Sequence, residues 1–265
     1  MKSKVKMIIW PIIYLVLIIN VCISFILVFR SYYFRSIFVF GSSMEPTLKG
    51  AQERVDYGII DDHKNAIDNL KRFQIVTTYY PFPNSSDYIG GYVHGGNNVI
   101  NEDEASYKIK RVYGFPGETI RFEIDLDRYQ SIRDCSDAEM YTESVQDTAQ
   151  KCIKVFTKKT GDLNFTEHTI KFKRKINVHR IPSYHEFEYE LGDDEYWVMG
   201  DNYSSSSDCF SQYPKQPIYY DNIVGVLIAI EGTCKISASD DPGSHEGTKK
   251  SYKCTERKRH FPVFY

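Results

Sequence analysis

The sequence lacks the residue patterns that usually bind metal ions or nucleic acids. It contains no C-x-x-C pair, and its seven histidines are scattered without the spacing of zinc ligands. Its formal net charge is −2, whereas nucleic-acid-binding domains usually carry a strong positive charge. We therefore expect no metal site and no nucleic-acid partner.

Charged residues are also missing from one long segment near the N-terminus. Residues 7–29 are uncharged, and a helix that rises about 1.5 Å per residue would cross a hydrocarbon core of about 30 Å over this length. Lysines precede the segment and arginines follow it, which favours a cytoplasmic N-terminus at residues 1–6 and an exported body. A cleaved signal peptide is the alternative, but the segment is long for one and no small-x-small site follows it. We predict a retained anchor in a lipid bilayer.

Cysteines are few, and their number limits the possible disulfides. Cys22 lies in the apolar segment, and the other five are Cys135, Cys152, Cys209, Cys234 and Cys254. Five cysteines cannot all pair with one another. In an exported body Cys135 could bridge Cys152, or Cys234 could bridge Cys254, and the sequence does not choose between these pairings.

Alanine is scarce and aromatic residues make up 15% of the chain, a composition that favours β-strands. Short apolar runs predict strands at residues 36–40, 72–81, 106–115, 195–202 and 222–230. The intervening residues 119–191 are polar, with weaker strand patterns in the segments IRFEI, KVFTK and HTIKFKRKI. The last residues, 236–265, are first rich in turn-forming residues and then basic, which is typical of a flexible C-terminal tail.

These patterns together predict a mainly β protein. We expect an antiparallel β-sheet core formed by residues 30–118 and 192–235, with a smaller inserted β lobe at residues 119–191. One N-terminal transmembrane helix precedes the core.

Three short blocks follow the apolar segment in a fixed order. They are GSSMEPTL at residues 41–48, IKRVYGFPGE at residues 109–118 and VMGDNYSSSSD at residues 198–208. In this order behind a membrane segment, they resemble the signature boxes of the type I signal peptidases. The strand RFQIVTTYYP resembles a fourth box, although Phe73-Gln74 replaces its usual Gly-Asp. The resemblance covers about residues 7–121 and 195–230.

The resemblance implies a membrane-anchored serine endopeptidase that needs no cofactor. Its substrates would be exported precursor proteins, cut after small-x-small sites such as Ala-x-Ala to release the signal peptide. The body would lie on the extracytoplasmic side of the plasma membrane. A peptidase of the mitochondrial inner membrane is the alternative compartment, and a catalytically silent anchored β domain that binds peptides or proteins is the alternative function.

The resemblance makes Ser43 the nucleophile and Lys110 the general base, and the chemistry of the two side chains agrees. A serine hydroxyl is a poor nucleophile until a neighbouring base removes its proton. A lysine amine has an unperturbed pKa of about 10.4 and can act as this base only if burial lowers that value. The apolar neighbours Ile109 and Val112 make such burial plausible.

The resemblance also assigns supporting roles in the third block. Ser206 would orient the lysine ammonium through a hydrogen bond, with the run 204–207 offering a rival register. Structural support would come from Gly200, Asp201, Asn202 and Asp208. Gly41 stands where some members place a serine donor for the oxyanion, so the Ser43 N–H would act with a second donor that the sequence does not identify.

Five apolar residues are candidate walls of the substrate pocket by the same resemblance, and ordinary core packing is the alternative for each. They are Ile37, Val39, Met44, Leu48 and Ile109.

Three positions depart from the family pattern. Tyr203 and Phe210 replace arginines, which removes the expected ion-pair partner of Asp208. Lys108 replaces a residue that is often apolar, and strand alternation places it on the same face as Lys110. A second positive charge there would lower the pKa of Lys110 further.

Overall fold

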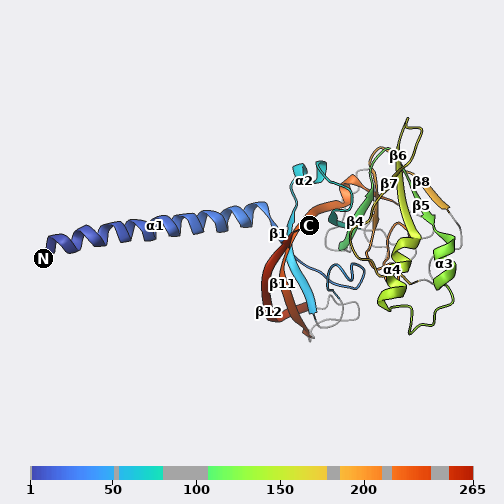
Figure 1. The fold of residues 1–265 in the computed structure, drawn as a ribbon. Helices are drawn as coiled ribbons and strands as arrows, with labels where there is room; N and C mark the ends of the chain where they lie inside the picture. The colour runs from blue at the N-terminus through green and yellow to red at the C-terminus, as the bar shows by residue number, and fades with distance from the viewer. Residues whose placement is uncertain are drawn as a thin grey trace.

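The computed structural model describes residues 2–50, 54–79, 107–177, 186–210, 217–239 and 251–264. The fold is mainly antiparallel β, with one long helix at the N-terminus, as the sequence predicts. Two sheets form the body of the molecule, and the helix projects away from it (Figure 1).

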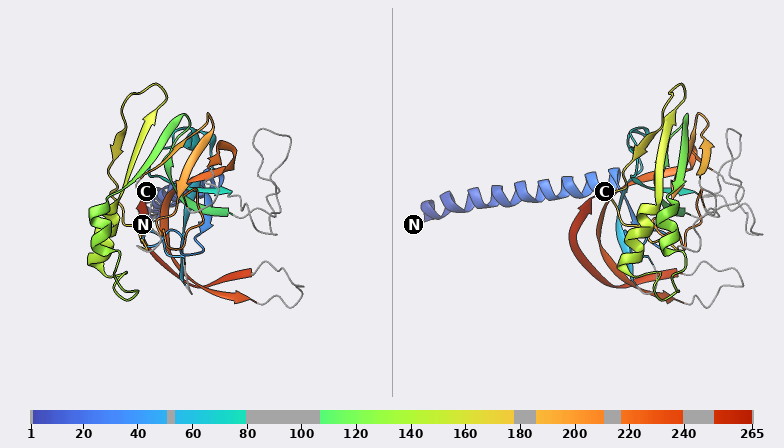
Figure 2. Two further views of the ribbon diagram at one scale, coloured as in Figure 1. Left: turned by 90° about the vertical axis from the view of Figure 1, so that its right-hand side faces the viewer. Right: turned by 45° about the vertical axis from the view of Figure 1, so that its right-hand side comes forward.

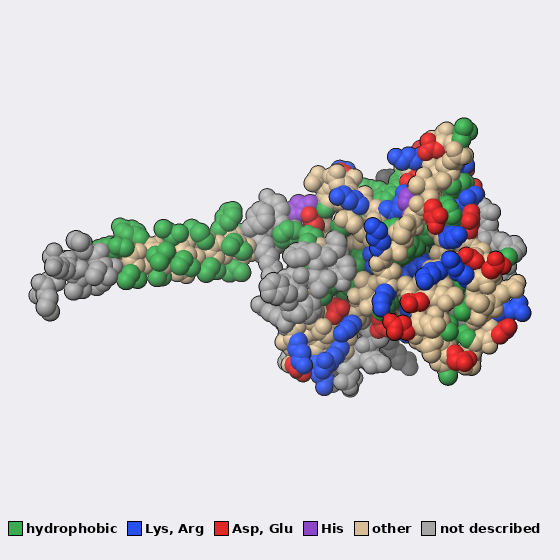
Figure 3. Space-filling view, viewed as in Figure 1, with side chains coloured by type: hydrophobic (Ala, Val, Ile, Leu, Met, Phe, Trp, Pro, Cys, Tyr) green, Lys and Arg blue, Asp and Glu red, His purple; other side chains and the backbone are tan. Residues whose placement is uncertain are grey.

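The N-terminal helix α1 spans Lys2–Tyr33. Within it, Trp10–Val28 is long and apolar enough to cross a membrane, and none of its residues is buried in the described structure. Figure 3 shows this helix as a rod of apolar side chains outside the body. The exposed residues of this segment are therefore mainly apolar, as is typical of side chains that lie in a lipid bilayer.

The larger sheet carries the predicted core. Its strand order is β1-β2-β11-β3-β4-β9-β10, with β12 added to β11, and all these pairs are antiparallel. The central strand β3 is buried along its whole length, which suits its β-branched sequence IVTTY. The strands are β1 (Arg35–Phe38), β2 (Arg54–Asp61), β3 (Ile75–Tyr79), β4 (Tyr107–Gly114), β9 (Glu195–Met199), β10 (Ile218–Tyr219), β11 (Ile223–Ser239) and β12 (Ser251–Phe264).

Five of these strands confirm the apolar runs of the sequence, namely β1, β3, β4, β9 and β11. Strand β2 was not predicted, although it pairs with both β1 and β11. A short helix, α2 (Lys64–Asp68), leads from β2 towards β3, and a 3-10 helix, η2 (Tyr220–Asn222), precedes β11.

The expected flexible tail is wrong for Ser251–Phe264, which forms β12. This strand pairs with β11 from Ser251 to Phe264, and the two curve together in Figure 2. A disulfide joins Cys234 on β11 to Cys254 on β12. Cys135 and Cys152 are free, so the alternative pairing does not form.

The insertion forms a second sheet in the order β7-β6-β5-β8. Its strands are β5 (Glu118–Ile124), β6 (Ile153–Lys159), β7 (Thr166–His168) and β8 (Glu186–Glu190). Strands at IRFEI and KVFTK are confirmed, whereas most of HTIKFKRKI is not strand and only Lys175 makes an isolated bridge, to Asn202.

Two helices between β5 and β6 were not predicted. Helix α3 (Leu126–Ile132) begins where the Asp125 carboxylate accepts a hydrogen bond from the Arg128 N–H, and α4 (Glu143–Cys152) leads directly into β6. Figure 1 places the insertion at the end of the body opposite α1.

The insertion shares its hydrophobic core with the larger sheet. Phe122 of β5 lies 6.2 Å from the ring of Trp197 on β9 and 5.1 Å from the ring of Phe210. A smaller core lies between β1, β2, β3, β11 and the loop after β1, and it contains Val39, Met44, Leu48, Ile60, Ile75, Leu227 and Ile230. The loop that carries Ser43 is therefore packed against its own cluster of apolar residues.

Candidate active site

Ser43 lies in a tight turn between β1 and β2. The turn is closed by hydrogen bonds from the Glu45 N–H to the Ser42 carbonyl (3.1 Å) and from the Leu48 N–H to the Met44 carbonyl (3.0 Å). The side chains of Met44 and Leu48 are fully buried in the smaller core, which fixes the loop from below. The segment that carries the Ser43 hydroxyl is thus fixed by hydrogen bonds of its backbone and by packing of its side chains.

The third block holds this loop from the other side. The Asn202 N–H donates to the Ser43 carbonyl (2.9 Å), and the Asn202 side-chain amide donates to the Ser42 carbonyl (2.9 Å). The Thr47 hydroxyl donates to the Asp201 carboxylate (2.5 Å). Asp201 and Asn202 therefore both contact the loop that carries Ser43 and hold it in place.

Gly200 allows the two segments to approach. A Cβ atom at this position would collide with the Ser206 Oγ and the Ser43 carbonyl oxygen. The Gly200 N–H also donates to the Asp208 carboxylate (2.9 Å). A larger residue would push the Ser43 loop away from the third block.

Lys110 approaches Ser43 from β4. Its side chain is 1% exposed, and its Nζ lies 3.0 Å from the Ser43 Oγ and 3.0 Å from the Ile109 carbonyl oxygen. The two residues are 67 positions apart in the chain and are in hydrogen-bond contact in the folded protein.

The surroundings of Lys110 favour its neutral form. Burial lowers the pKa of its amine from 10.5 to about 8. The Asp208 carboxylate opposes this change, whereas the positive charge of Lys108 adds to it. A substantial fraction of Lys110 is therefore uncharged at mildly alkaline pH.

The hydrogen bond expected between Ser206 and Lys110 does not form. The Ser206 Oγ is buried beside Gly200 and has no hydrogen-bond partner among the described residues. The Ile109 carbonyl takes the expected place of Ser206 as the second acceptor for the Lys110 amine. Two serines of the rival register have other partners: the Ser204 hydroxyl donates to the Asn202 side chain (2.5 Å), and the Ser205 hydroxyl is hydrogen-bonded with the Ser42 hydroxyl (2.8 Å).

Arg111 is a structural residue that the sequence analysis missed. Its guanidinium donates to both Asp201 carboxylate oxygens (2.8 and 2.5 Å) and to the Phe73 carbonyl (2.6 Å). It also lies 3.7 Å from the centre of the Phe172 ring. The signal was present, because Arg111 directly follows the candidate base in the same block.

The substituted positions of the third block have partners elsewhere. The Tyr203 hydroxyl accepts a hydrogen bond from the buried Arg174 of the insertion (3.1 Å), and the Phe210 ring packs in the shared core. Asp208 accepts from the backbone N–H groups of Gly200 and Phe210 (2.9 and 3.2 Å). The departures from the family pattern are therefore accommodated by packing and backbone contacts.

A cavity of about 800 Å³ opens at the two candidate catalytic residues. One side is formed by β1 and the loop after it, and the other by residues 108–110 of β4. Of the five predicted pocket residues, Ile37 and Ile109 line this cavity. Val39, Met44 and Leu48 are instead buried in the smaller core beneath it, so the packing alternative holds for these three.

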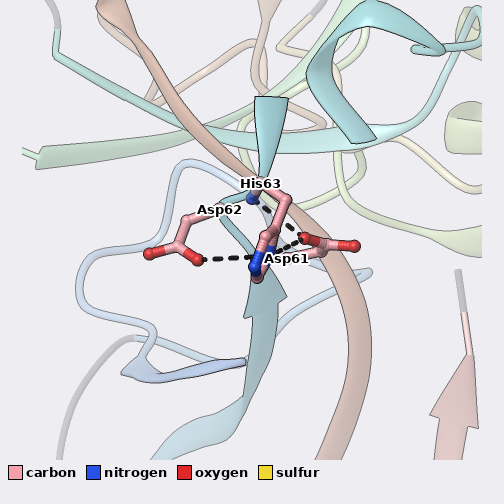
Figure 4. Close-up of side chains that lie close together, drawn as sticks. All are labelled: Asp61, Asp62 and His63. Carbon is pink, nitrogen blue, oxygen red and sulfur yellow. Dashed lines mark hydrogen bonds and ion pairs between the residues drawn. The ribbon is translucent and has the colours of Figure 1, made fainter. Parts of the chain in front are cut away.

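An acidic cluster at the end of β2 resembles a metal site in composition. The ligand atoms of Asp61, Asp62 and His63 lie within 4.8 Å of one another (Figure 4). Asp61 accepts hydrogen bonds from the His63 backbone N–H (2.9 Å) and contacts its ring Nδ1 (3.0 Å), while Asp62 pairs with Arg35 (3.0 Å). These contacts account for the cluster as part of a turn, and we assign it no metal.

Comparison with known protein families identifies the family of the chain. Residues 12–230 match the family described as signal peptidase, peptidase S26. The chain therefore belongs to the signal peptidase family, whose members are serine peptidases. Comparison with curated proteins gives no match.

Proposed function

We propose that the chain is a serine endopeptidase in which Ser43 is the nucleophile and Lys110 the general base. The single observation that supports this assignment is the 3.0 Å contact between the Lys110 Nζ and the Ser43 Oγ at a lysine that is almost completely buried. Burial makes the amine available as a base, and the contact gives it a direct path to the hydroxyl proton.

In the acylation step, the neutral Lys110 amine accepts the Ser43 proton while the Ser43 Oγ attacks the carbonyl carbon of the scissile bond. The new C–O bond places negative charge on the carbonyl oxygen, and the Ser43 N–H is a candidate donor to it. When the C–N bond breaks, the Lys110 ammonium gives its proton to the leaving amine. The products of this step are the released mature chain and an ester of the signal peptide on Ser43.

In the deacylation step, Lys110 is neutral again and accepts a proton from water. The water oxygen attacks the ester carbonyl, and the C–O bond to Ser43 breaks as the proton returns to the Ser43 oxygen. The released signal peptide ends in a carboxylate. Lys110 thus serves as base and then as acid in each half of the reaction.

The cavity suits an extended peptide with small side chains. It lies between β1 and β4, where a substrate strand could lie beside residues 108–110. Ile37 and Ile109 both pack on the smaller core and both face this cavity, which favours small apolar side chains at that side. This arrangement supports cleavage after small-x-small sites such as Ala-x-Ala.

We further propose that α1 anchors the chain in the plasma membrane, with the body on the extracytoplasmic side. Three lysines precede the apolar segment, which favours retention of that end in the cytoplasm. The Cys234–Cys254 disulfide favours an oxidising compartment for the body. Exported precursors would then reach the cavity as they emerge from the same bilayer.

The proposal is tested with the full chain in detergent and a synthetic precursor peptide that contains one Ala-x-Ala site. We expect cleavage after the second alanine, and a loss of at least about 1,000-fold in kcat/KM for Ser43→Ala and for Lys110→Met. Lys151→Met on the exposed surface of α4 is the matched control and should retain activity. Mass spectrometry of the products defines the cleaved bond. Equal inactivity of the wild type and both variants would refute the proposal.

A further inference from the structure

The sequence contains three N-x-S/T triplets, the pattern that accepts an N-linked glycan where it lies on the surface of an exported protein. They begin at Asn84, Asn164 and Asn202. Asn84 lies outside the described residues. The other two asparagines have opposite surroundings, so the structure separates a triplet that can carry a glycan from one that cannot.

Asn202 is not accessible to a glycan in the folded protein. It is 1% exposed, and its side-chain nitrogen, which is the atom that a glycan modifies, donates a hydrogen bond to the Ser42 carbonyl (2.9 Å). A sugar on this nitrogen would displace the loop that carries Ser43. The triplet at Asn202 therefore belongs to the candidate active site.

Asn164 lies on the connection between β6 and β7, which projects from the insertion in Figure 1. Asn164 and Thr166, the first and third residues of the triplet, are both exposed. The ring of Phe165 between them is partly buried, with its centre 3.9 Å from the Arg121 guanidinium and 4.8 Å from the Lys158 Nζ. These contacts hold the middle side chain, and the two side chains that glycan transfer needs remain at the surface.

The neighbours of Asn164 are groups that a glycan would usefully cover. Leu163 is 94% exposed, more than any other large apolar side chain in the described part of the chain. Strand β7 begins two residues after Asn164 and is the end strand of the second sheet. The open edge of such a strand can pair with another chain. A bulky, hydrated glycan would cover the leucine and shield the start of this edge from association.

We propose that Asn164 is an N-glycosylation site whose glycan covers the connection between β6 and β7. The donor is an oligosaccharide on a polyprenyl diphosphate. The Asn164 Nδ2 forms a bond to the anomeric carbon, the C–O bond to the diphosphate breaks, and the nitrogen releases one proton to a base of the transferase. The inference rests on the proposed orientation, because the body must lie on the extracytoplasmic side to meet this donor. The cavity at Ser43 and Lys110 belongs to the other sheet, so the glycan lies outside the candidate active site.

The test inserts the full-length chain into endoplasmic-reticulum microsomes, which supply the transferase and a dolichyl diphosphate oligosaccharide. The wild type is compared with Asn164→Gln, Thr166→Ala and the conservative Thr166→Ser. A separate variant, Asp134→Asn, adds an Asn-Cys-Ser triplet in the turn after α3, where the Asp134 side chain is 83% exposed. This reporter shows whether the body has reached the lumen. Mass spectrometry of the tryptic peptides of residues 134–151 and 160–171, with and without enzymatic release of glycans, measures the modification of each site.

We expect a glycan on the wild-type peptide 160–171, its complete loss in Asn164→Gln and Thr166→Ala, and its retention in Thr166→Ser. An unmodified Asn164 in chains whose reporter triplet carries a glycan would overturn the inference and leave the proposed function intact. Absence of a glycan from both sites would mean that the body does not reach the lumen, which would overturn the proposed orientation and the inference with it. Cleavage of the Ala-x-Ala peptide by the same chains tests the proposed peptidase activity separately.

Discussion

Lys110 and Arg111 are neighbours on β4 and are both buried, but only Arg111 has a carboxylate in direct contact with its side chain. The Arg111 guanidinium meets the Asp201 carboxylate through two hydrogen bonds. The Lys110 amine meets a hydroxyl and a carbonyl, neither of which carries a formal charge. The two sides of one strand thus hold a paired cation and an unpaired amine within one residue of each other.

This difference gives Arg111 a structural role and leaves Lys110 suited to a chemical one. A carboxylate in direct contact offsets the cost of burying the Arg111 guanidinium, and the ion pair holds Asp201 in place. Lys110 has no such contact, and burial lowers its pKa to about 8. Asp201 in turn binds Thr47 of the Ser43 loop. The paired cation therefore positions the loop that faces the unpaired amine.

Removal of the paired cation should have the largest effect on stability. Arg111→Met leaves the Asp201 carboxylate, whose side chain is fully buried, without its guanidinium partner. We expect a loss of about 3–5 kcal/mol in the free energy of unfolding. Urea unfolding of the full chain in detergent measures this loss, with Arg133→Met on the exposed surface as the control. A variant as stable as the wild type would contradict the role given to Arg111.

Removal of the unpaired Lys110 amine should instead increase the free energy of unfolding. Below about pH 8 Lys110 is protonated in both the folded and the unfolded states, and the folded state bears the full cost of a buried ammonium. As the pH rises from about 8 to above 10.5, the folded state loses its proton first, so stability increases with pH. Lys110→Met removes this cost, and we expect it to stabilise the protein by up to about 3 kcal/mol at neutral pH.

The measurement is the midpoint of urea unfolding for the wild type and Lys110→Met across this pH range. The gain should shrink as the pH rises and disappear above the ordinary lysine pKa of 10.5. A gain that is independent of pH would point to better packing of methionine and would argue against a buried ammonium.

Asn202 lies between the surroundings of Arg111 and those of Lys110, because it follows Asp201 in the chain and donates hydrogen bonds to the backbone of the Ser43 loop. Asn202→Ala removes the hydrogen bond to the Ser42 carbonyl and keeps the backbone bond to Ser43. We expect kcat/KM to fall by about tenfold, since the hydroxyl is held less firmly against Lys110. Stability should fall by only about 1 kcal/mol. The comparison of kinetic and unfolding data distinguishes this loosening from general destabilisation, which would lower both to the same extent.

The same contrast shows what the sequence could and could not predict. The strands around the site were predictable because their apolar runs match a buried sheet. Ser43 and Lys110 could be assigned because the blocks that contain them resemble those of the type I signal peptidases. The Arg111–Asp201 pair was not predictable, since local patterns do not reveal which of many charged residues meet in the core. Strand β12 was missed because its charged side chains resemble a tail, whereas its backbone pairs with β11.

Three of the five predicted pocket residues do not line the cavity, for a related reason. An apolar side chain in a loop can face a substrate or the interior, and the sequence does not distinguish the two sides. Val39, Met44 and Leu48 face the interior, while Ile37 and Ile109 face the cavity. Ser206 likewise stands where the family pattern places the residue that orients the lysine, but the Lys110 amine donates to the Ile109 carbonyl instead.

The smallest predicted effect concerns the charge beside the unpaired amine. Lys108 lowers the pKa of Lys110, although burial is the larger cause. In the wild type, kcat/KM for a peptide with a neutral middle residue should rise with pH through about 8, as Lys110 loses its proton.

Lys108→Met removes the neighbouring positive charge, so the pKa of Lys110 should rise and the acidic limb of the pH profile should move to higher pH. We expect a shift of less than about one pH unit, because Lys108 is only partly buried and solvent screens its charge. Lys151→Met is the control and should leave the limb in place. A limb that stays fixed or moves to lower pH in Lys108→Met would mean that the charge of Lys108 does not lower the pKa of Lys110.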